Sequence, residues 1–326
     1  MVKYSILDLV MIPEGRDLSS ALAGSVALAQ AAEKSGYERY WVAEHHNIPG
    51  IASSATTIII ATLAQATTSI RVGSGGMMLP NHSPLVVAEQ FATLDALYPG
   101  RIDLGIGRAP GGSAETTLAV RGVAGVHREL ADDVCHLQHY LADDGALPIR
   151  AIPEPHDVPI WILGSGMYGA KLAAERGLPF AFASHFAPRF LLEAIELYRK
   201  SFRPSPKLRT PYVTAGVNVF AADSYAEAEF IASSHRDWVV RRNRAQGVPL
   251  PKPSEGLMAR IHPREREAME MELGCTALGT IPDIQQWLRG FVGATGVDEI
   301  MIDARIHDQN ARIRSHQLTA EAIRTL

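Results

Sequence analysis

The chain has 326 residues, of which 47% are hydrophobic and 20% charged, with a formal net charge of −4 at pH 7. This composition predicts a globular protein, and a slightly acidic chain does not predict a nucleic-acid partner. Two cysteines, Cys135 and Cys275, without a CxxC pair, indicate neither a disulfide framework nor a zinc site. No signal-peptide pattern opens the chain, and no apolar stretch approaches the roughly 20 residues that span a bilayer, so we expect a cytoplasmic protein without membrane contact.

Short β-rich runs alternate with longer helical patterns along the whole chain. The predicted strands are 5–12, 37–42, 70–79, 101–107, 159–163, 179–183, 212–222 and 298–303. Each precedes a helical segment, the first of which runs from Leu18 to Lys34 and ends at Gly36. This alternation predicts a parallel sheet with helices outside it, and eight such units predict a closed (β/α)8 TIM barrel, α/β in class.

The chain is expected to form one domain, 1–326, with an insertion between strands 7 and 8. Residues 247–279 are rich in proline, glycine and charge, and their apolar residues follow no regular period. Two explanations stay open for this segment: a lid near the barrel mouth, or a solvated linker.

Catalytic groups of such barrels come from the C-terminal ends of the strands, and two strand ends here favour an anion. Arg108 follows the fourth predicted strand within "GIGRAPGG", and a guanidinium suits bidentate phosphate binding. "LGSGMYG" follows the fifth strand and opens a helix, so Gly164, Ser165 and Gly166 offer N–H groups, a hydroxyl and a helix N-terminus. We predict one phosphorylated ligand bound across these neighbouring strand ends.

Gly75 and Gly76 form a glycine pair near the end of the third predicted strand. Glycine inside a strand marks either a bend or bulge of the barrel wall, or a place where a flat ligand presses on the backbone. The pattern alone leaves both explanations open.

Glu44, His45 and His46 follow the second predicted strand in "WVAEHHN". Adjacent residues of an extended chain point to opposite sides, so at most one of the two histidines should face the site. That geometry is poor for a metal, and we predict none. A neutral imidazole both donates and accepts near physiological pH, which favours a catalytic or cofactor-contacting histidine over a structural one.

The order of these segments resembles a known family. "WVAEHHN", "RVGSGGMMLPNHSPLVVAEQFATLDALYPGRIDLGIGRAPG" and "GLPFAFASHF" are similar to the bacterial luciferase-like flavin monooxygenases, most densely over residues 37–112. The resemblance implies a (β/α)8 barrel that binds FMN at its C-terminal mouth.

The resemblance also implies roles for single residues. His45 would lie beside the reactive face of the flavin as the catalytic group, with Glu44 as a cofactor contact. Gly75-Gly76 would form a non-proline cis peptide against the ring. The residues implied to hold the phosphate are Arg108, Gly164, Ser165, Gly166 and Tyr168, and His185 is expected in the substrate pocket.

The implied function is a monooxygenase that uses reduced FMN, supplied by a separate flavin reductase, and O2 on a small organic substrate, as a homodimer. The alternatives are a deazaflavin (F420)-dependent hydride-transfer enzyme, a flavin-binding protein without turnover, and a metal-dependent hydrolase, which would need converging metal ligands. FMN is favoured because the mouth offers one fixed positive charge and one helix N-terminus, whereas Arg101 begins strand four at the opposite end. The sequence does not identify the substrate.

Overall fold

A computed structural model of the protein describes residues 2–109, 114–121, 129–154, 157–244 and 248–324. Nine parallel strands form one sheet, with bounds β1 Lys3–Asp8, β2 Arg39–Val42, β3 Arg71–Met78, β4 Ile102–Gly107, β5 Ile160–Gly164, β6 Phe180–Phe182, β7 Val213–Ala221, β8 Thr276–Gly279 and β9 Glu299–Asp303. Strands β1 to β7 and β9 close into a ring, because β6 pairs with β7, β7 with β9 and β9 with β1. The predicted eight-stranded barrel is confirmed.

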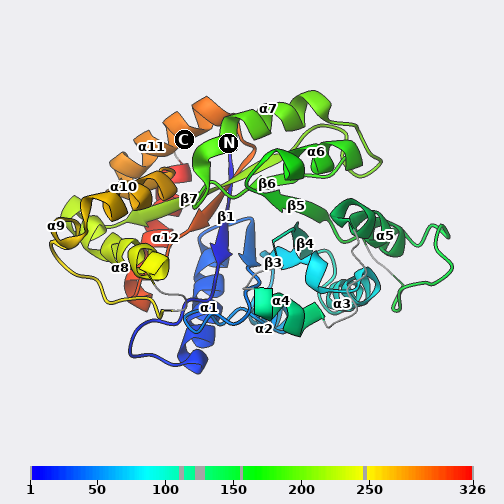
Figure 1. Ribbon diagram of the computed structural model, residues 1–326, viewed down its shortest axis with the longest axis horizontal. Helices are drawn as coiled ribbons and strands as arrows, with labels where there is room; N and C mark the ends of the chain where they lie inside the picture. Colours follow the sequence, from blue (N-terminus) through cyan, green and yellow to red (C-terminus); the bar gives the residue numbers. More distant parts are fainter. Residues whose placement is uncertain (1, 110–113, 122–128, 155–156, 245–247, 325–326) are drawn as a thin grey trace.

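The helices surround this barrel, with α6 and α7 at the top of Figure 1, α3 and α5 on the right and α8 to α10 on the left. Their bounds are α1 Leu18–Lys34, α2 Thr56–Ala66, α3 Pro84–Leu97, α4 Ala114–Arg121, α5 Leu130–Ala142, α6 Met167–Arg176, α7 Leu191–Ser201, α8 Tyr225–Arg244, α9 Leu257–Arg260, α10 Pro263–Glu272, α11 Ile281–Thr295 and α12 Gln309–Arg324. Helix α1 has the predicted bounds, because a capping box of Asp17 and Ser20 fixes its start. Within the described ranges, no helix combines the length and apolar character needed to cross a membrane.

The ninth strand corrects the predicted count. Strand β8 lies inside the segment 247–279 and pairs only with β7, outside the closed ring. The sequence signal was weak, since four residues in "TALG" alternate without a long apolar run. The described part of the segment is therefore helical in α9 and α10 and then extended, and its action as a lid stays a prediction.

Alternation along each strand separates two apolar regions. On β2, Tyr40 and Val42 pack outward against the helices, whereas Trp41 points into the barrel with Leu7 and Met301. This period of two, repeated around the ring, fills the barrel with its own layer of side chains below the mouth.

A buried ion network lies beneath that layer. Arg39 donates from Nε to Glu299 Oε1 at 2.7 Å and from Nη1 to Asp103 Oδ2 at 2.7 Å, and all three side chains are buried. Arg71 holds the second oxygen of Asp103 at 2.6 Å, and Ser5 donates to Glu299. The network thus joins β1, β2, β3, β4 and β9 from inside the barrel.

Replacing Arg39 by methionine should strongly destabilise the protein, because it leaves Glu299 and part of Asp103 buried without their cation. Removing one partner of a buried pair costs about 3–5 kcal/mol, measurable as a shift in the urea midpoint. Lys200→Met, which breaks an exposed pair with Glu196, is the control and should change the free energy of unfolding by less than about 0.5 kcal/mol. A loss below about 1 kcal/mol for Arg39→Met would contradict a structural role for the network.

Buried histidines make the folded state sensitive to acid. Burial and the charge of Arg312 lower the pKa of His316 to about 3, and burial lowers the pKa of His185 to about 4. In the unfolded chain, histidine has a pKa of about 6.5. As the pH falls below that value, the unfolded state takes up protons that the folded state does not, so stability decreases with falling pH.

The urea midpoint of the protein without cofactor should therefore fall between pH 6.5 and pH 4, before most buried carboxylates titrate. His316→Gln should make this slope shallower, because it removes one of the groups that bind a proton only when unfolded. A midpoint that stays constant over that range would show that these imidazoles are charged in the folded protein.

Candidate active site

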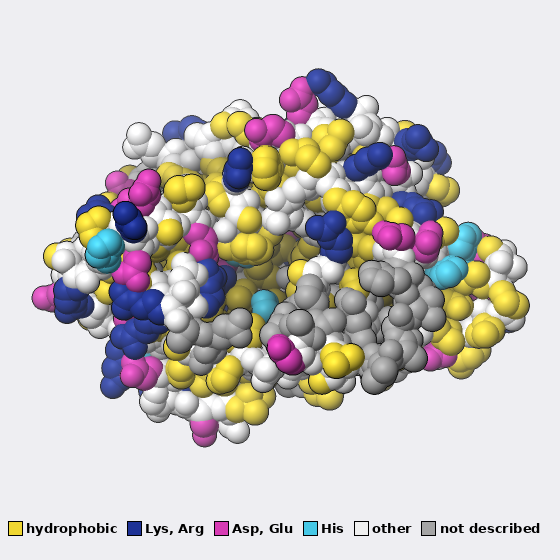
Figure 2. Space-filling model, in the orientation of Figure 1, with side chains coloured by type: hydrophobic (Ala, Val, Ile, Leu, Met, Phe, Trp, Pro, Cys, Tyr) yellow, Lys and Arg dark blue, Asp and Glu magenta, His cyan; other side chains and the backbone are white. Residues whose placement is uncertain are grey.

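A cavity of about 1130 Å³ opens at the carboxyl ends of the barrel strands, and each of the eight contributes to its lining. Figure 2 shows the hollow near the centre of this face, with hydrophobic side chains in its wall. Pockets for one drug-sized ligand measure about 300–1,000 Å³, so this cavity has room for a cofactor together with a small substrate.

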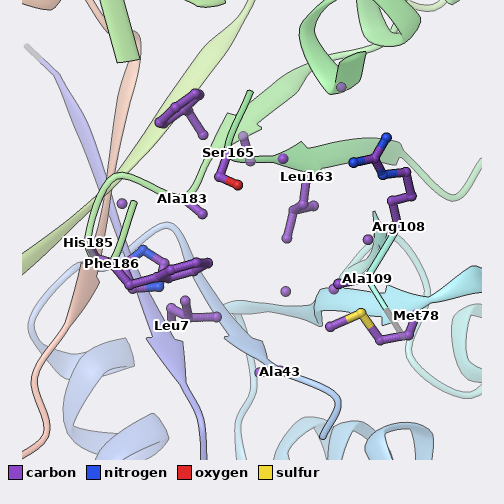
Figure 3. A pocket seen from close by; sticks show the side chains of 18 of the residues that line it. Leu7, Ala43, Met78, Arg108, Ala109, Leu163, Ser165, Ala183, His185 and Phe186 are labelled. Carbon is purple, nitrogen blue, oxygen red and sulfur yellow. The ribbon is translucent and has the colours of Figure 1, made fainter. Parts of the chain in front are cut away.

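The predicted anion-binding residues meet at one end of the cavity. Arg108 follows β4, and its guanidinium carbon lies 4.8 Å from the ring centroid of Tyr168, in the first turn of α6. No side chain caps α6 at Gly166, and a Cβ built on Gly166 would meet nothing within 4 Å. Figure 3 shows Arg108 and Ser165 facing the cavity from neighbouring strand ends. A cation and an uncapped helix N-terminus beside open space suit a single phosphate.

The glycine pair Gly75-Gly76 lines the floor of the cavity, and its peptide bond is cis, as expected. A Cβ on Gly75 would lie 2.7 Å from Leu7 Cδ1, and one on Gly76 would lie 2.9 Å from the carbonyl oxygen of Gly105. The pairing of β3 with β4 also shifts register between Ser74 and Met77. The barrel wall therefore has the predicted irregularity here, and the same peptide forms part of the cavity surface.

His45 continues the inward-facing series of β2. Arg39, Trp41, Ala43 and His45 alternate along the chain, and the last three line the cavity. The Nδ1 atom of His45 is buried and has no hydrogen-bond partner within the ranges that the structure describes. Burial and the positive charge of Arg305 lower the pKa of His45 to about 4. Its imidazole is therefore neutral near pH 7 and free to exchange hydrogen bonds with a ligand.

The expectation that only one histidine would face the site is wrong, because His45 and His46 both line the cavity. Asn47 has a positive φ of 56° and turns the chain directly after His46, so strand alternation holds as far as His45 but not at His46. The two imidazoles still differ, since His46 Nε2 lies 2.7 Å from Glu44 Oε1, whereas His45 Nδ1 has no hydrogen-bond partner among the described residues.

Glu44 is held behind the cavity wall rather than in it. Its Oε1 is shared by His46 and by His82 Nε2 at 2.8 Å, and its Oε2 accepts the backbone N–H of Met78 at 2.9 Å. Burial alone would raise the pKa of Glu44, but these hydrogen bonds lower it. A contact between Glu44 and a cofactor thus stays a prediction.

Glu44, His46 and His82 are also the one group among the described residues whose ligand atoms could surround a metal ion. The Nε2 atoms of His46 and His82 lie 2.7 and 2.8 Å from Glu44 Oε1, which are distances of direct hydrogen bonds. A zinc ion would lie about 2.0–2.2 Å from each ligand atom and would hold the ligand atoms further apart from one another. The cluster therefore has the geometry of a hydrogen-bonded support for the segment that carries His45.

The sequence analysis missed two further arginines, and its count of one fixed positive charge at the mouth is wrong. Arg305 and Arg242 line the same cavity as Arg108, whereas Arg101 donates to the carbonyl of Ala64 in α2 and lies outside the lining. Arg305 lies two residues past the C-terminal end of β9, the kind of position at which a barrel carries catalytic and binding groups. Arg242 lies on α8, where only the tertiary structure reveals its position.

The three arginines differ in their partners. Arg305 binds Asp303 Oδ2 at 2.7 Å, and Arg242 binds Glu272 at 2.7 Å. Among the residues that the structure describes, Arg108 has no carboxylate partner. Its guanidinium lies over the ring of Tyr168. Of the three arginines in the lining, only Arg108 has no carboxylate partner among the described residues, which makes it the best candidate to bind a phosphate.

Comparisons with known proteins agree with this geometry. The sequence profile described as "Luciferase-like monooxygenase" matches residues 2–275. A "Luciferase-like monooxygenase" of Escherichia coli (strain K12) is 44% identical over 323 residues, covering 98% of this chain and 96% of the relative. The "N-acetyl-S-alkylcysteine monooxygenase" of Bacillus subtilis (strain 168) is 32% identical, covering 99% and 98% of the two chains.

Solved structures extend the comparison to the fold. The crystal structure of apo-MsnO8 is 37% identical, with a TM-score of 0.92, and covers 100% of this chain and 99% of its own. The fold is also that of a Type II Baeyer-Villiger monooxygenase constituent in complex with FMN and of an F420-dependent secondary alcohol dehydrogenase, each 17% identical. The fold by itself therefore admits either cofactor. This chain belongs to the luciferase-like monooxygenase family and is an enzyme of that family.

Proposed function

We propose that this enzyme is an FMN-dependent monooxygenase that oxygenates a small organic substrate with O2. The observation that carries the proposal is Arg108, which has no carboxylate partner in the described part of the chain and lies beside the uncapped start of α6, in a cavity that the Gly75-Gly76 peptide also lines. These residues fit FMN, because a compact phosphate needs one cation and a few N–H donors, and a flat ring needs a surface without side chains.

The residues of this chain would divide the work. The phosphate of FMN would be bound by Arg108, Ser165 and the first turn of α6. Leu7, which contacts Gly75, would give the flavin ring an apolar support. Reduced FMN, when bound, would supply the electrons for the reaction with O2. His45 would hold or move a proton at its unpartnered Nδ1, and the apolar cavity wall would exclude water.

The reduced flavin would come from a separate reductase, because the one GxGxxG match in the sequence, Gly164–Gly169, is the turn that we assign to the FMN phosphate and leaves no second such turn for a nicotinamide cofactor. The name of the Bacillus subtilis relative supports a thioether as one candidate substrate class. An N-acetyl-S-alkylcysteine would test this candidate. We propose a homodimer as the assembly.

Parallel titrations with FMN, riboflavin and the deazaflavin F420 test the cofactor. We expect FMN to bind with a Kd at or below about the micromolar range, and Arg108→Met to weaken FMN binding about ten- to a hundredfold without weakening riboflavin. Arg150→Met, which removes an exposed arginine paired with Asp143 outside the cavity, is the matched control. Tight F420 binding without FMN affinity would replace the monooxygenase by a hydride-transfer enzyme.

His45→Ala should retain FMN but slow the reaction of bound reduced FMN with O2 by about a hundredfold or more, the scale of a lost acid–base group. The measurement is stopped-flow reoxidation, with the H2O2 released in parallel. His46→Ala should have the smaller effect, because its imidazole is already held by Glu44. The assignment is wrong if the His46 variant is impaired and the His45 variant is not.

A further inference from the structure

The cavity has a second polar end, opposite the proposed phosphate site. In the ring of eight strands, β4 and β9 are four places apart, so Arg108 and Arg305 extend from opposite sides of the mouth. In Figure 3, Arg108 and His185 lie on opposite sides of the cavity. The proposed binding of FMN phosphate uses the first end and leaves the second without a role.

Arg305 is held rigidly at this second end. Its Nε and Nη2 both bind Asp303 Oδ2, at 2.9 and 2.7 Å, and its guanidinium carbon lies 4.7 Å from the ring centroid of Trp238. The side chain is 5% exposed and lines the cavity, and its Nη1 has no hydrogen-bond partner among the described residues. A guanidinium fixed in this way offers donors to a ligand at little cost in side-chain entropy.

One buried polar atom near Arg305 also lacks a partner. His185 lines the cavity and is at least nine-tenths buried, and its Nδ1 atom makes no hydrogen bond to the residues that the structure describes. A Cβ on Gly216 would lie 2.3 Å from His185 Nδ1, so the glycine admits this ring position. An unpartnered buried polar atom at a cavity wall supports a polar ligand group there.

The charge of Arg305 reaches part of the cavity. After burial itself, it lowers the pKa of His45 and of the buried His235, whereas at His185 the opposite effect of Asp303 on the pKa is larger. These imidazoles are neutral near pH 7 and add no second cation. Because Asp303 offsets part of the charge of Arg305, this end suits a singly charged carboxylate better than a phosphate dianion.

The wall between Arg305 and His45 is apolar, with Leu9, Ile51 and Met301 in the lining. We propose that this end of the cavity is a substrate subsite, in which Arg305 binds the carboxylate of a small organic acid and places its apolar body beside His45. The inference rests on the proposed function and deepens it, since it assigns the substrate class to organic acids.

The test compares hexanoate with hexanamide, which share an apolar chain and differ in charge, by calorimetry on the protein with and without FMN. We expect hexanoate to bind about ten- to a hundredfold more tightly than hexanamide, the factor typical of a charge-assisted hydrogen bond. Arg305→Met should abolish this preference, and Arg305→Lys should retain part of it.

Two further variants keep the result interpretable. Arg305→Met leaves Asp303 buried without its cation, so the double variant Arg305→Met/Asp303→Asn removes both charges and should also lose the preference while remaining folded. Arg242→Met is the matched control, because it removes the other guanidinium beside Trp238, and it should keep the preference.

The inference is overturned if hexanoate shows no preference over hexanamide, or if Arg242→Met abolishes the preference and Arg305→Met keeps it. It is also overturned if the Arg305 variants, rather than Arg108→Met, lose the preference for FMN over riboflavin, since Arg305 would then bind the phosphate. Carboxylate preference at Arg305 in a protein that binds F420 and not FMN would instead contradict the proposed function alone.

Discussion

The buried contact of Arg39 with Asp103 and Glu299 is the constraint on which the barrel interior depends. A guanidinium between two carboxylates inside a closed sheet is tolerated only when its donors are met, and here Nε, Nη1 and Nη2 all have partners. The guanidinium carbon also lies 4.7 Å from the ring centroid of Trp161. The network therefore fixes the level of the strands relative to one another and the position of the aromatic layer above it.

The strand register that this network fixes determines which side chains reach the mouth of the barrel. Because side chains alternate along β2, the register that places Arg39 inside the barrel also places Trp41 inside, and it brings His45 to the cavity. A shift of one residue would turn Glu44 inward and remove it from His46 and His82. The orientation of the His45 imidazole therefore depends on the ion network around Arg39, at the start of the strand that leads to it.

Charge is distributed unevenly around the cavity. Arg305 and Arg242 have carboxylate partners, whereas Arg108 lies beside the uncapped start of α6 and has no carboxylate partner among the described residues. His45 and His185 are neutral near pH 7, chiefly because burial disfavours protonation. Under our proposals, the end with Arg108 would bind a phosphate dianion and the end with Arg305 a singly charged carboxylate. A cofactor and a substrate would then bind in a defined order along the cavity.

The sequence by itself determined the barrel and the bounds of α1, because a period of two and a helix cap act within a few residues. It also placed Arg108 and Ser165 at the ends of neighbouring strands. The cis peptide of Gly75-Gly76 was implied by the family resemblance, because the glycine pair alone left both a bend and a ligand contact open. Three features were decided by the tertiary structure. Strand β8 forms because β7 offers it an edge outside the ring, and His46 reaches the cavity because Asn47 turns the chain. Arg242 and Arg305 come together around Trp238 from α8 and from the end of β9. The pairing of Asn218 with Thr276 and the contact of Trp238 with Arg305 join residues far apart in the sequence. No local pattern encodes the partner of a side chain that only the closed barrel brings near.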